Sequence, residues 1–334
     1  MNYLMIKKAL LFVGSLSLLA SCGTETISSE AIDTDPTPLK ILSPKGAPAL
    51  VLFSEGNNEN WETKDDAKQV NAQLQNNEYD VIIAPVYGAM KAIKSFNCDF
   101  ALARVVTGGN FYLVGVNKTI EDRPTSDSYI VGFAEQDVTG KAFKELYKNH
   151  WNLGEPTNVE WVDTAQNTLG LLKAGKKGDR QIDYILTAEP VFTNAKTQLD
   201  EGVTLTETYD IRKEWKDYTG QQAMVQAGIF VRKSILSAKK SALKAFMAKI
   251  EENIVKATDS EKVQEVTDTL NAYNSVLTEQ AKRFGYNANL VKALQSGNKN
   301  RFALVTKEMN IDVNAFLTKL GEEAYSSSYF VTIE

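Results

Sequence analysis

The sequence has little histidine and cysteine: His150 is the only histidine and Cys22 and Cys98 are the only cysteines among 334 residues. This scarcity argues against a zinc site of histidine and cysteine ligands and against a catalytic triad that needs a histidine base. His150 closes the pattern KAFKELYKNHW, where a polar group favours a helix C-terminus.

Basic residues are also in deficit. Lys7 and Lys8 precede an apolar N-terminal run and would leave with it, so 37 basic residues fall to 35 against 42 acidic ones, a net charge of −7. A chain this acidic lacks the basic face that nucleic-acid binding requires. We therefore expect no nucleic-acid partner.

Residues 1–21 have the organisation of a secretory signal peptide, in which a basic start precedes an apolar run too short to span a bilayer comfortably. The run ends in Leu19-Ala20-Ser21-Cys22, which resembles the lipobox of bacterial lipoproteins. The resemblance implies cleavage before Cys22 and attachment of diacylglycerol to its thiol. The alternative is an ordinary signal peptide with a chance cysteine. Cys98 is then expected to be a small buried residue without a disulfide partner.

Residues 22–37 are polar, acidic and poor in large apolar side chains, which is typical of a disordered tether. From Lys40 onward, short apolar runs alternate with helical patterns, which predicts an α/β fold in two domains. After Ser234 the apolar period is helical to near the end of the chain.

The lobe boundaries are expected at two polar segments, residues 121–128 and 209–219, where the chain would cross between domains. The expected division is lobe 1 from residues 38–124 and 220–334, and lobe 2 from residues 125–219.

The stretch KILSPKGAPAL, residues 40–50, predicts a buried strand that ends at a tight turn and leads into a helix, with Pro48 in the first helical turn. The same order recurs at Asp80–Pro85, Tyr129–Phe133, Val159–Asp163 and Tyr184–Pro190. Ligands of open α/β sheets bind outside the carboxyl ends of the strands, so these turns predict one crevice. Gly108 and Gly109 predict positive φ and a close approach of the backbone to a neighbour or ligand.

The order of these motifs, together with the lipobox, resembles the type II periplasmic-binding-protein family of ABC importers, and especially the branch that binds nitrate, alkanesulfonates, taurine or thiamine-precursor pyrimidines. The residues that carry the resemblance are GAP at 46–48, DVIIAP at 80–85 and DYILTAEP at 183–190. The resemblance covers residues 39–334. It implies an α/β, two-lobed periplasmic-binding-protein type II fold with a helical C-terminal region, closing on a ligand between the lobes.

The ligand-binding candidates lie where the predicted strands end: Lys45, Gly46, Ala47, Tyr87, Asn110, Phe111, Asp163, Thr164, Gln166 and Glu189. Several have a plain structural alternative. Lys45 could be solvated, Tyr87 could pack against a helix, and Asp163 could cap one. Asn110 and Phe111 could form an ordinary hairpin.

Glu189 is the sharpest candidate, because a carboxylate at a strand end could accept hydrogen bonds from a ligand amine or ring N–H. Its alternative is a contact between lobes or with a helix dipole. No arginine occupies a strand end, since Arg104 lies inside a strand pattern. With Tyr87 and Phe111 expected in the opposite lobe, this favours a flat nitrogen heterocycle or small amine over nitrate or a sulfonate.

Together these observations predict a monomeric solute-binding lipoprotein, lipid-anchored at Cys22 on the extracytoplasmic side of a bacterial membrane, that delivers its ligand to an ABC permease. We expect no cofactor, no metal and no enzymatic activity, because the sequence lacks a nucleophile–base pairing, a P-loop and a dinucleotide fingerprint. The alternatives are an enzyme on the same bilobal fold and a surface lipoprotein that only binds protein or signals.

Overall fold

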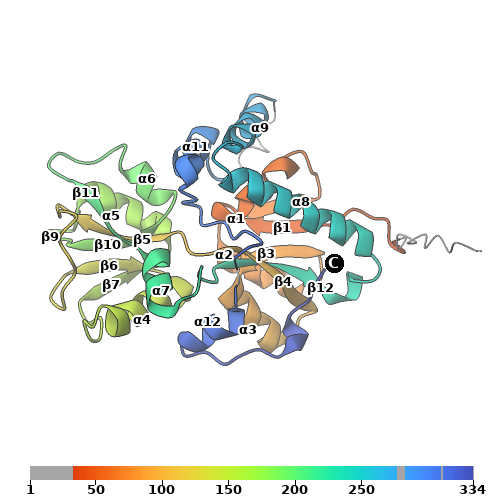
Figure 1. Ribbon diagram of the computed structural model, residues 1–334, viewed down its shortest axis with the longest axis horizontal. Coiled ribbons are helices and arrows are strands. Elements are labelled where there is room, and N and C mark those ends of the chain that lie inside the picture. The colour runs from red at the N-terminus through yellow and green to blue at the C-terminus, as the bar shows by residue number, and fades with distance from the viewer. Residues whose placement is uncertain (1–32, 277–282, 310, 334) are drawn as a thin grey trace, which may run out of the picture.

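The structure, a computed structural model, describes residues 33–276, 283–309 and 311–333. These residues form two lobes, each built on a five-stranded sheet (Figure 1). The strand order is β2-β1-β3-β12-β4 in lobe 1 and β11-β5-β10-β6-β7 in lobe 2. The predicted signal peptide and Cys22 lie outside the described residues. No helix within the described ranges has the length and apolar character needed to cross a membrane.

Lobe 1 contains the first strands and the C-terminal helices. Its strands are β1 (Ile41–Pro44), β2 (Trp61–Lys64), β3 (Val81–Pro85), β4 (Phe100–Thr107) and β12 (Ala227–Arg232). Its helices are α1 (Ala47–Leu50), α2 (Ala67–Ala72), α3 (Val86–Phe96), α8 (Lys240–Thr258), α9 (Val263–Val276), α11 (Ala288–Gln295) and α12 (Val313–Lys319). Strands β1, β2 and β3 are parallel, and β12 runs antiparallel to β3 and β4.

Successive residues of β3 show why this sheet is covered on both faces. Val81 and Ile83 pack with α1, α8, α9 and α11, whereas Ile82 and Ala84 pack with α2 and α3. A strand buried on both sides reads as a continuous apolar run, as DVIIAP does. The predicted helical C-terminal region is confirmed, and its apolar period supplies the stripe of α8 that faces this core.

Lobe 2 follows the same plan. Its strands are β5 (Phe111–Val116), β6 (Ile130–Phe133), β7 (Val159–Val162), β10 (Tyr184–Ala188) and β11 (Leu205–Asp210), with a small hairpin of β8 (Lys176–Lys177) and β9 (Arg180–Gln181). Its helices are α4 (Val138–Glu145), continued by a π-helical turn over Leu146–His150, then α5 (Thr168–Ala174), α6 (Val191–Ala195) and α7 (Ile211–Thr219). Strands β6, β7 and β10 are parallel, and β5 is antiparallel to β10 and β11.

The expected first crossing at residues 121–128 is wrong. Strand β5 pairs with β10 and β11, so the chain already belongs to lobe 2 at Phe111. The crossing is the short segment Gly108–Asn110, and residues 121–128 form a loop of lobe 2. The return lies between α7 and β12, just after the expected segment, because residues 209–219 belong to β11 and α7. Lobe 2 therefore ends at Thr219, as the expected division has it.

The two crossings lie side by side, and the glycines explain how. Met224 donates its N–H to the Gly108 carbonyl at 3.0 Å. A Cβ on Gly108 would lie 2.7 Å from the Cβ of Ala223, and one on Gly109 would lie 2.8 Å from the Met224 sulfur. Gly109 also has a φ of 94°. Both roles predicted for the glycine pair, positive φ and close backbone approach, are confirmed.

A third segment of the chain is hydrogen-bonded to the first crossing. The chain from α11 to α12 runs past the junction of the lobes (Figure 1). There Ala303 accepts the N–H of Gly108 at 2.7 Å, and Val305 donates its N–H to Val106 at 3.0 Å.

A tether is expected over residues 22–37, but the described part of this segment, from Asp33 onward, is bound to lobe 1. Asp33 accepts the N–H groups of Ser241 (2.7 Å) and Ala242 (3.0 Å) in the first turn of α8. The N-cap residue of that helix, Lys239, supplies no side-chain cap, so a distant carboxylate takes the role. Residues from Asp33 onward therefore belong to the folded part of the chain.

We predict that Asp33→Ala lowers the unfolding temperature of the soluble chain that begins at Gly23, because α8 loses an acceptor for its first N–H groups. The N–H of Ser241 lowers the pKa of Asp33. A lowered pKa stabilises the fold above the pKa of the unfolded chain, so the difference should be full above about pH 4 and shrink below it. Exposed Thr34→Ala is the matched control, and an equal effect of both variants in calorimetry would contradict the capping role.

Candidate functional site

A cleft of about 470 Å³ opens between the lobes. It lies at the carboxyl ends of the three parallel strands of each sheet. Three turns of lobe 1 line it, those after β1, β2 and β3, and three turns of lobe 2, those after β6, β7 and β10. The crossings close its floor with Asn110, Gln226 and Ala227. This is the place where open α/β sheets bind their ligands.

Nine of the ten predicted site residues line this cleft: Lys45, Gly46, Ala47, Tyr87, Asn110, Phe111, Asp163, Thr164 and Glu189. Gln166 does not; it lies exposed in the short helical turn Ala165–Asn167. Phe111 comes from lobe 2 and not from the lobe of Tyr87, because β5 belongs to the second sheet.

The first turn contributes differently from the expectation. Helix α1 has only one turn, and the Gly46 N–H is taken by the Phe284 carbonyl at 2.9 Å, which leaves it no capacity for a ligand. Lys45 forms an ion pair with Asp65 at 2.6 Å. At this turn the Gly46 N–H and the Lys45 ammonium are therefore both bonded to other groups of the chain.

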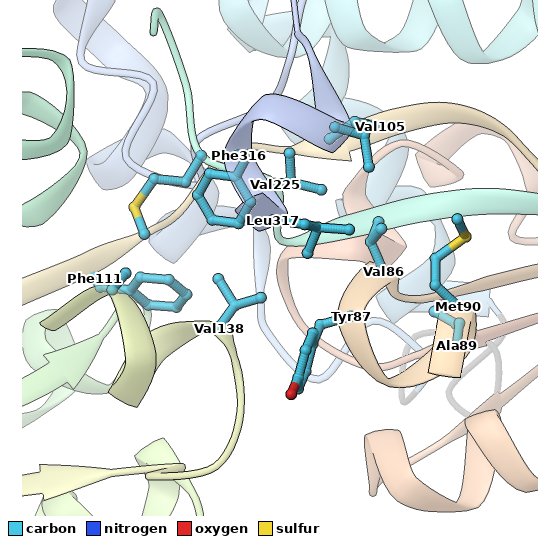
Figure 2. Packing of buried hydrophobic residues seen from close by; sticks show 14 of the residues in the cluster. Val86, Tyr87, Ala89, Met90, Val105, Phe111, Val138, Val225, Phe316 and Leu317 are labelled. Carbon is cyan, nitrogen blue, oxygen red and sulfur yellow. The ribbon is translucent and has the colours of Figure 1, made fainter. Parts of the chain in front are cut away.

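Apolar side chains from both lobes meet in the middle of the cleft. In Figure 2, Val138 at the start of α4 stands between the rings of Phe111 and Tyr87, all members of one hydrophobic cluster. Phe111 and Phe133 contact edge to face, with ring centroids 6.0 Å apart. The Tyr87 hydroxyl donates to Glu322 at 2.7 Å, and Lys141 of α4 pairs with the same carboxylate at 2.8 Å, which ties lobe 2 to the C-terminal segment beside the cleft.

A chain of hydrogen bonds connects the two crossings to lobe 2. Gly109 donates its N–H to the Gln226 side chain at 3.2 Å, and Gln226 donates to the Asn110 side-chain oxygen at 3.0 Å. Asn110 in turn donates to the Glu189 carbonyl at 2.6 Å. The side-chain amides of Asn110 and Gln226 on the cleft floor are thus bonded to each other.

Glu189 has partners within the chain as well. Its side chain is 0% exposed and pairs with Arg301 at 2.8 Å, while the Thr193 N–H and hydroxyl each donate to it at 3.0 Å. The carboxylate is therefore already paired within the chain. Its contacts match the alternative of a contact between lobes or with a helix dipole, since Arg301 arrives on the segment that follows α11 and the Thr193 N–H belongs to the first turn of α6.

Arg301 is the residue that the sequence did not reveal. It also pairs with Glu207 at 2.8 Å, and its guanidinium lies over the Tyr112 ring at 4.1 Å. It is absent from the cleft lining, which holds no arginine within the described residues. Arg104 lies in β4 as expected and pairs with Glu251. No local pattern marks Arg301, because its partner is 112 residues away in sequence.

Of the lobe 2 carboxylates that line the cleft, two have no side-chain hydrogen bond or ion pair among the described residues, Asp137 and Asp163. The capping alternative for Asp163 is wrong, because Thr164 is the N-cap and donates to Asn167 at 2.8 Å. Asp137 occupies the N-cap position of α4 but makes no capping bond. Partial desolvation by the surrounding cleft walls raises the pKa of Asp137, although the residue is still exposed to water; Lys68 opposes the shift and Asp66 adds to it.

Neither a scan against protein families nor a search of curated proteins found a match for this chain. Solved structures do match. An ABC transporter protein from Parabacteroides distasonis is 15% identical, with a TM-score of 0.64 over 89% of this chain and 100% of that one. The zinc-bound ligand-binding component of an ABC-type import system from Staphylococcus aureus is 12% identical, with a TM-score of 0.62 over 88% and 96% of the two chains. The periplasmic aliphatic sulphonate binding protein of Escherichia coli is 12% identical, with a TM-score of 0.60 over 86% of each chain.

These likenesses confirm the predicted fold class. The chain has the two-lobed α/β fold of periplasmic binding proteins, and the cleft described above lies between its lobes.

We predict that Arg301→Met destabilises the fold by about 3–5 kcal/mol, because it leaves the Glu189 carboxylate buried without a counter-charge. The double variant Arg301→Met, Glu189→Gln should recover much of this loss, since the glutamine side chain carries no charge. Urea unfolding measures both. Exposed Lys299→Met, two positions away, is the control. Equal losses in the single and double variants would show that the charge of Glu189 is not the cause.

Proposed function

We propose that this protein is the solute-binding component of an ABC importer and that it captures a small organic solute between its lobes. The observation that carries the proposal is the cleft of about 470 Å³ at the carboxyl ends of the strands. This volume lies in the range of ordinary ligand sites. Its walls come from two separate sheets, so rotation of one lobe against the other would open and close it.

The hinge of this rotation is proposed at Gly108–Asn110 and at the segment between α7 and β12. Closure of two-lobed proteins needs only a few residues that absorb changes in φ and ψ. Gly109 already has a positive φ, which costs glycine little. The pair between Lys141 of lobe 2 and Glu322 of the C-terminal segment would favour the closed arrangement.

An enzyme on the same fold remains the weaker proposal. The polar groups on the cleft floor, Asn110, Glu189 and Gln226, hydrogen-bond to other groups of the chain. The only histidine of the sequence, His150, lies beside Glu214 at 3.4 Å and not in the cleft lining. Transport without chemistry is the simpler use of such a site.

Cell-envelope anchoring completes the proposal. The sequence Leu19-Ala20-Ser21-Cys22 supports lipidation of Cys22 and a position on the extracytoplasmic side of a bacterial membrane. A monomer held there by its lipid would pass its solute to a permease in the same membrane. A protein that binds only other proteins would have no use for the cleft.

We predict that a small solute co-purifies with the soluble domain or binds it from a metabolite mixture, as mass spectrometry of the denatured protein would detect. A ligand at about a hundred times its Kd should stabilise the fold by roughly 2.7 kcal/mol. Ala67→Trp would fill the cleft and abolish binding, whereas Gln69→Trp, exposed on the same helix, should not. Equal binding by both variants would overturn the cleft as the site.

We further predict that Cys22→Ser releases the protein into the soluble fraction. Stable anchoring by lipid needs two acyl chains, because a single chain binds a membrane only marginally. Detergent partitioning of both forms tests this. Ser21→Ala is the control, since it keeps the thiol and a small residue before it. A Cys22→Ser variant that still partitions into detergent would contradict lipid anchoring.

A further inference from the structure

The charge that the cleft leaves unpaired bears on the chemistry of its ligand. Two ion pairs neutralise four groups, Lys45 with Asp65 at 2.6 Å and Glu189 with Arg301 at 2.8 Å. The other charged side chains of the lining are Asp66, Asp137, Asp163 and Lys68. Three carboxylates against one ammonium group leave the cleft with a net negative charge.

Asp137 and Asp163 lie at the same edge of lobe 2. Strands β6 and β7 are parallel neighbours in which Phe133 pairs with Val162, and each aspartate follows one of these strand ends. Both residues are exposed to water in this conformation, and within the described chain neither carboxylate has a hydrogen bond or ion pair. Closure of the lobes would take both further from water, which is unfavourable unless the ligand compensates their charge.

An apolar surface lies beside these carboxylates. Phe111, Phe133 and Val138 line the same cleft from lobe 2. Tyr87 of lobe 1 lies on the other side of Val138 from Phe111 (Figure 2). Aromatic faces attract cations as well as hydrocarbon. The Lys91 ammonium lies 4.5 Å from the centroid of the Tyr87 ring, and the Lys141 ammonium lies 5.3 Å from the same centroid.

Two other ligand classes fit the cleft less well. Among the described residues, no group of three or more histidine, cysteine, aspartate or glutamate side chains is arranged to hold a metal ion. An anion would meet three carboxylates against the ammonium of Lys68, and Asp137 occupies the N-cap of α4, where the positive end of the helix would otherwise favour it.

We propose that the cleft selects a small organic cation, such as an alkylated amine or a protonated nitrogen heterocycle. Asp137 and Asp163 compensate its charge, and its apolar part lies against Phe111, Phe133 and Val138. This inference rests on the proposed function of the cleft as a solute site.

Matched probes at constant ionic strength test the inference by thermal shift and calorimetry. Choline is compared with its uncharged carbon isostere, and benzylammonium with benzyl alcohol. Methanesulfonate and nitrate represent the anions. The cations should bind and stabilise the protein, while the neutral isosteres and the anions should not.

Isosteric variants assign the effect to residues. Asp137→Asn and Asp163→Asn should each weaken benzylammonium binding by about tenfold or more, as loss of a charged hydrogen-bond acceptor does. Asp179→Asn, exposed between β8 and β9, removes the same charge outside the cleft and should leave affinity unchanged.

Three results would overturn the inference: equal binding of cations and isosteres, preference for an anion, or unchanged cation affinity in both cleft variants. If a neutral or anionic solute binds and Ala67→Trp abolishes it, the cation class is wrong and the solute-binding function stands. If no probe binds and no solute co-purifies, both proposals are wrong.

Discussion

The buried ion pair between Glu189 and Arg301 holds together the part of the molecule where the two lobes meet. A carboxylate removed from water is stable only with a counter-charge and hydrogen bonds, and here Arg301 and Thr193 supply them. The backbone carbonyl of Glu189 also receives Asn110, which bonds to Gln226 on the second crossing. Both crossings and the C-terminal segment are therefore fixed around one residue at the end of β10.

This arrangement determines which groups the cleft offers to a ligand. The amides and the glutamate on its floor are occupied by the chain itself, and Lys45 is neutralised by Asp65. What remains is a pair of aspartates in lobe 2 and an apolar surface shared between the lobes. The same parallel strands that place the turns at one edge thus decide both the position of the cleft and its residual charge.

The central strands were predictable because a strand buried on both faces consists of consecutive apolar residues, as β3, β5 and β10 do. The strands that sequence reasoning missed lie at sheet edges. In β2 only Trp61 is buried, and in β11 only Thr208 is, so neither carries the apolar signal of a central strand. The first crossing was misplaced for a related reason. A polar loop resembles a linker, whereas only strand pairing reveals that β5 had already joined the second sheet.

The sequence by itself determined the α/β class, the helical C-terminal region and the cleft position of nine of the ten candidate residues, because strand ends and turns follow from local composition. Tertiary structure alone decided which of those residues remain available. Glu189 stood out in the sequence as a free carboxylate, yet an arginine 112 residues away neutralises it. Capping was only the alternative for Asp163, and the structure gives that role to Thr164. Ion pairing depends on distances in space, which the order of residues along the chain does not contain.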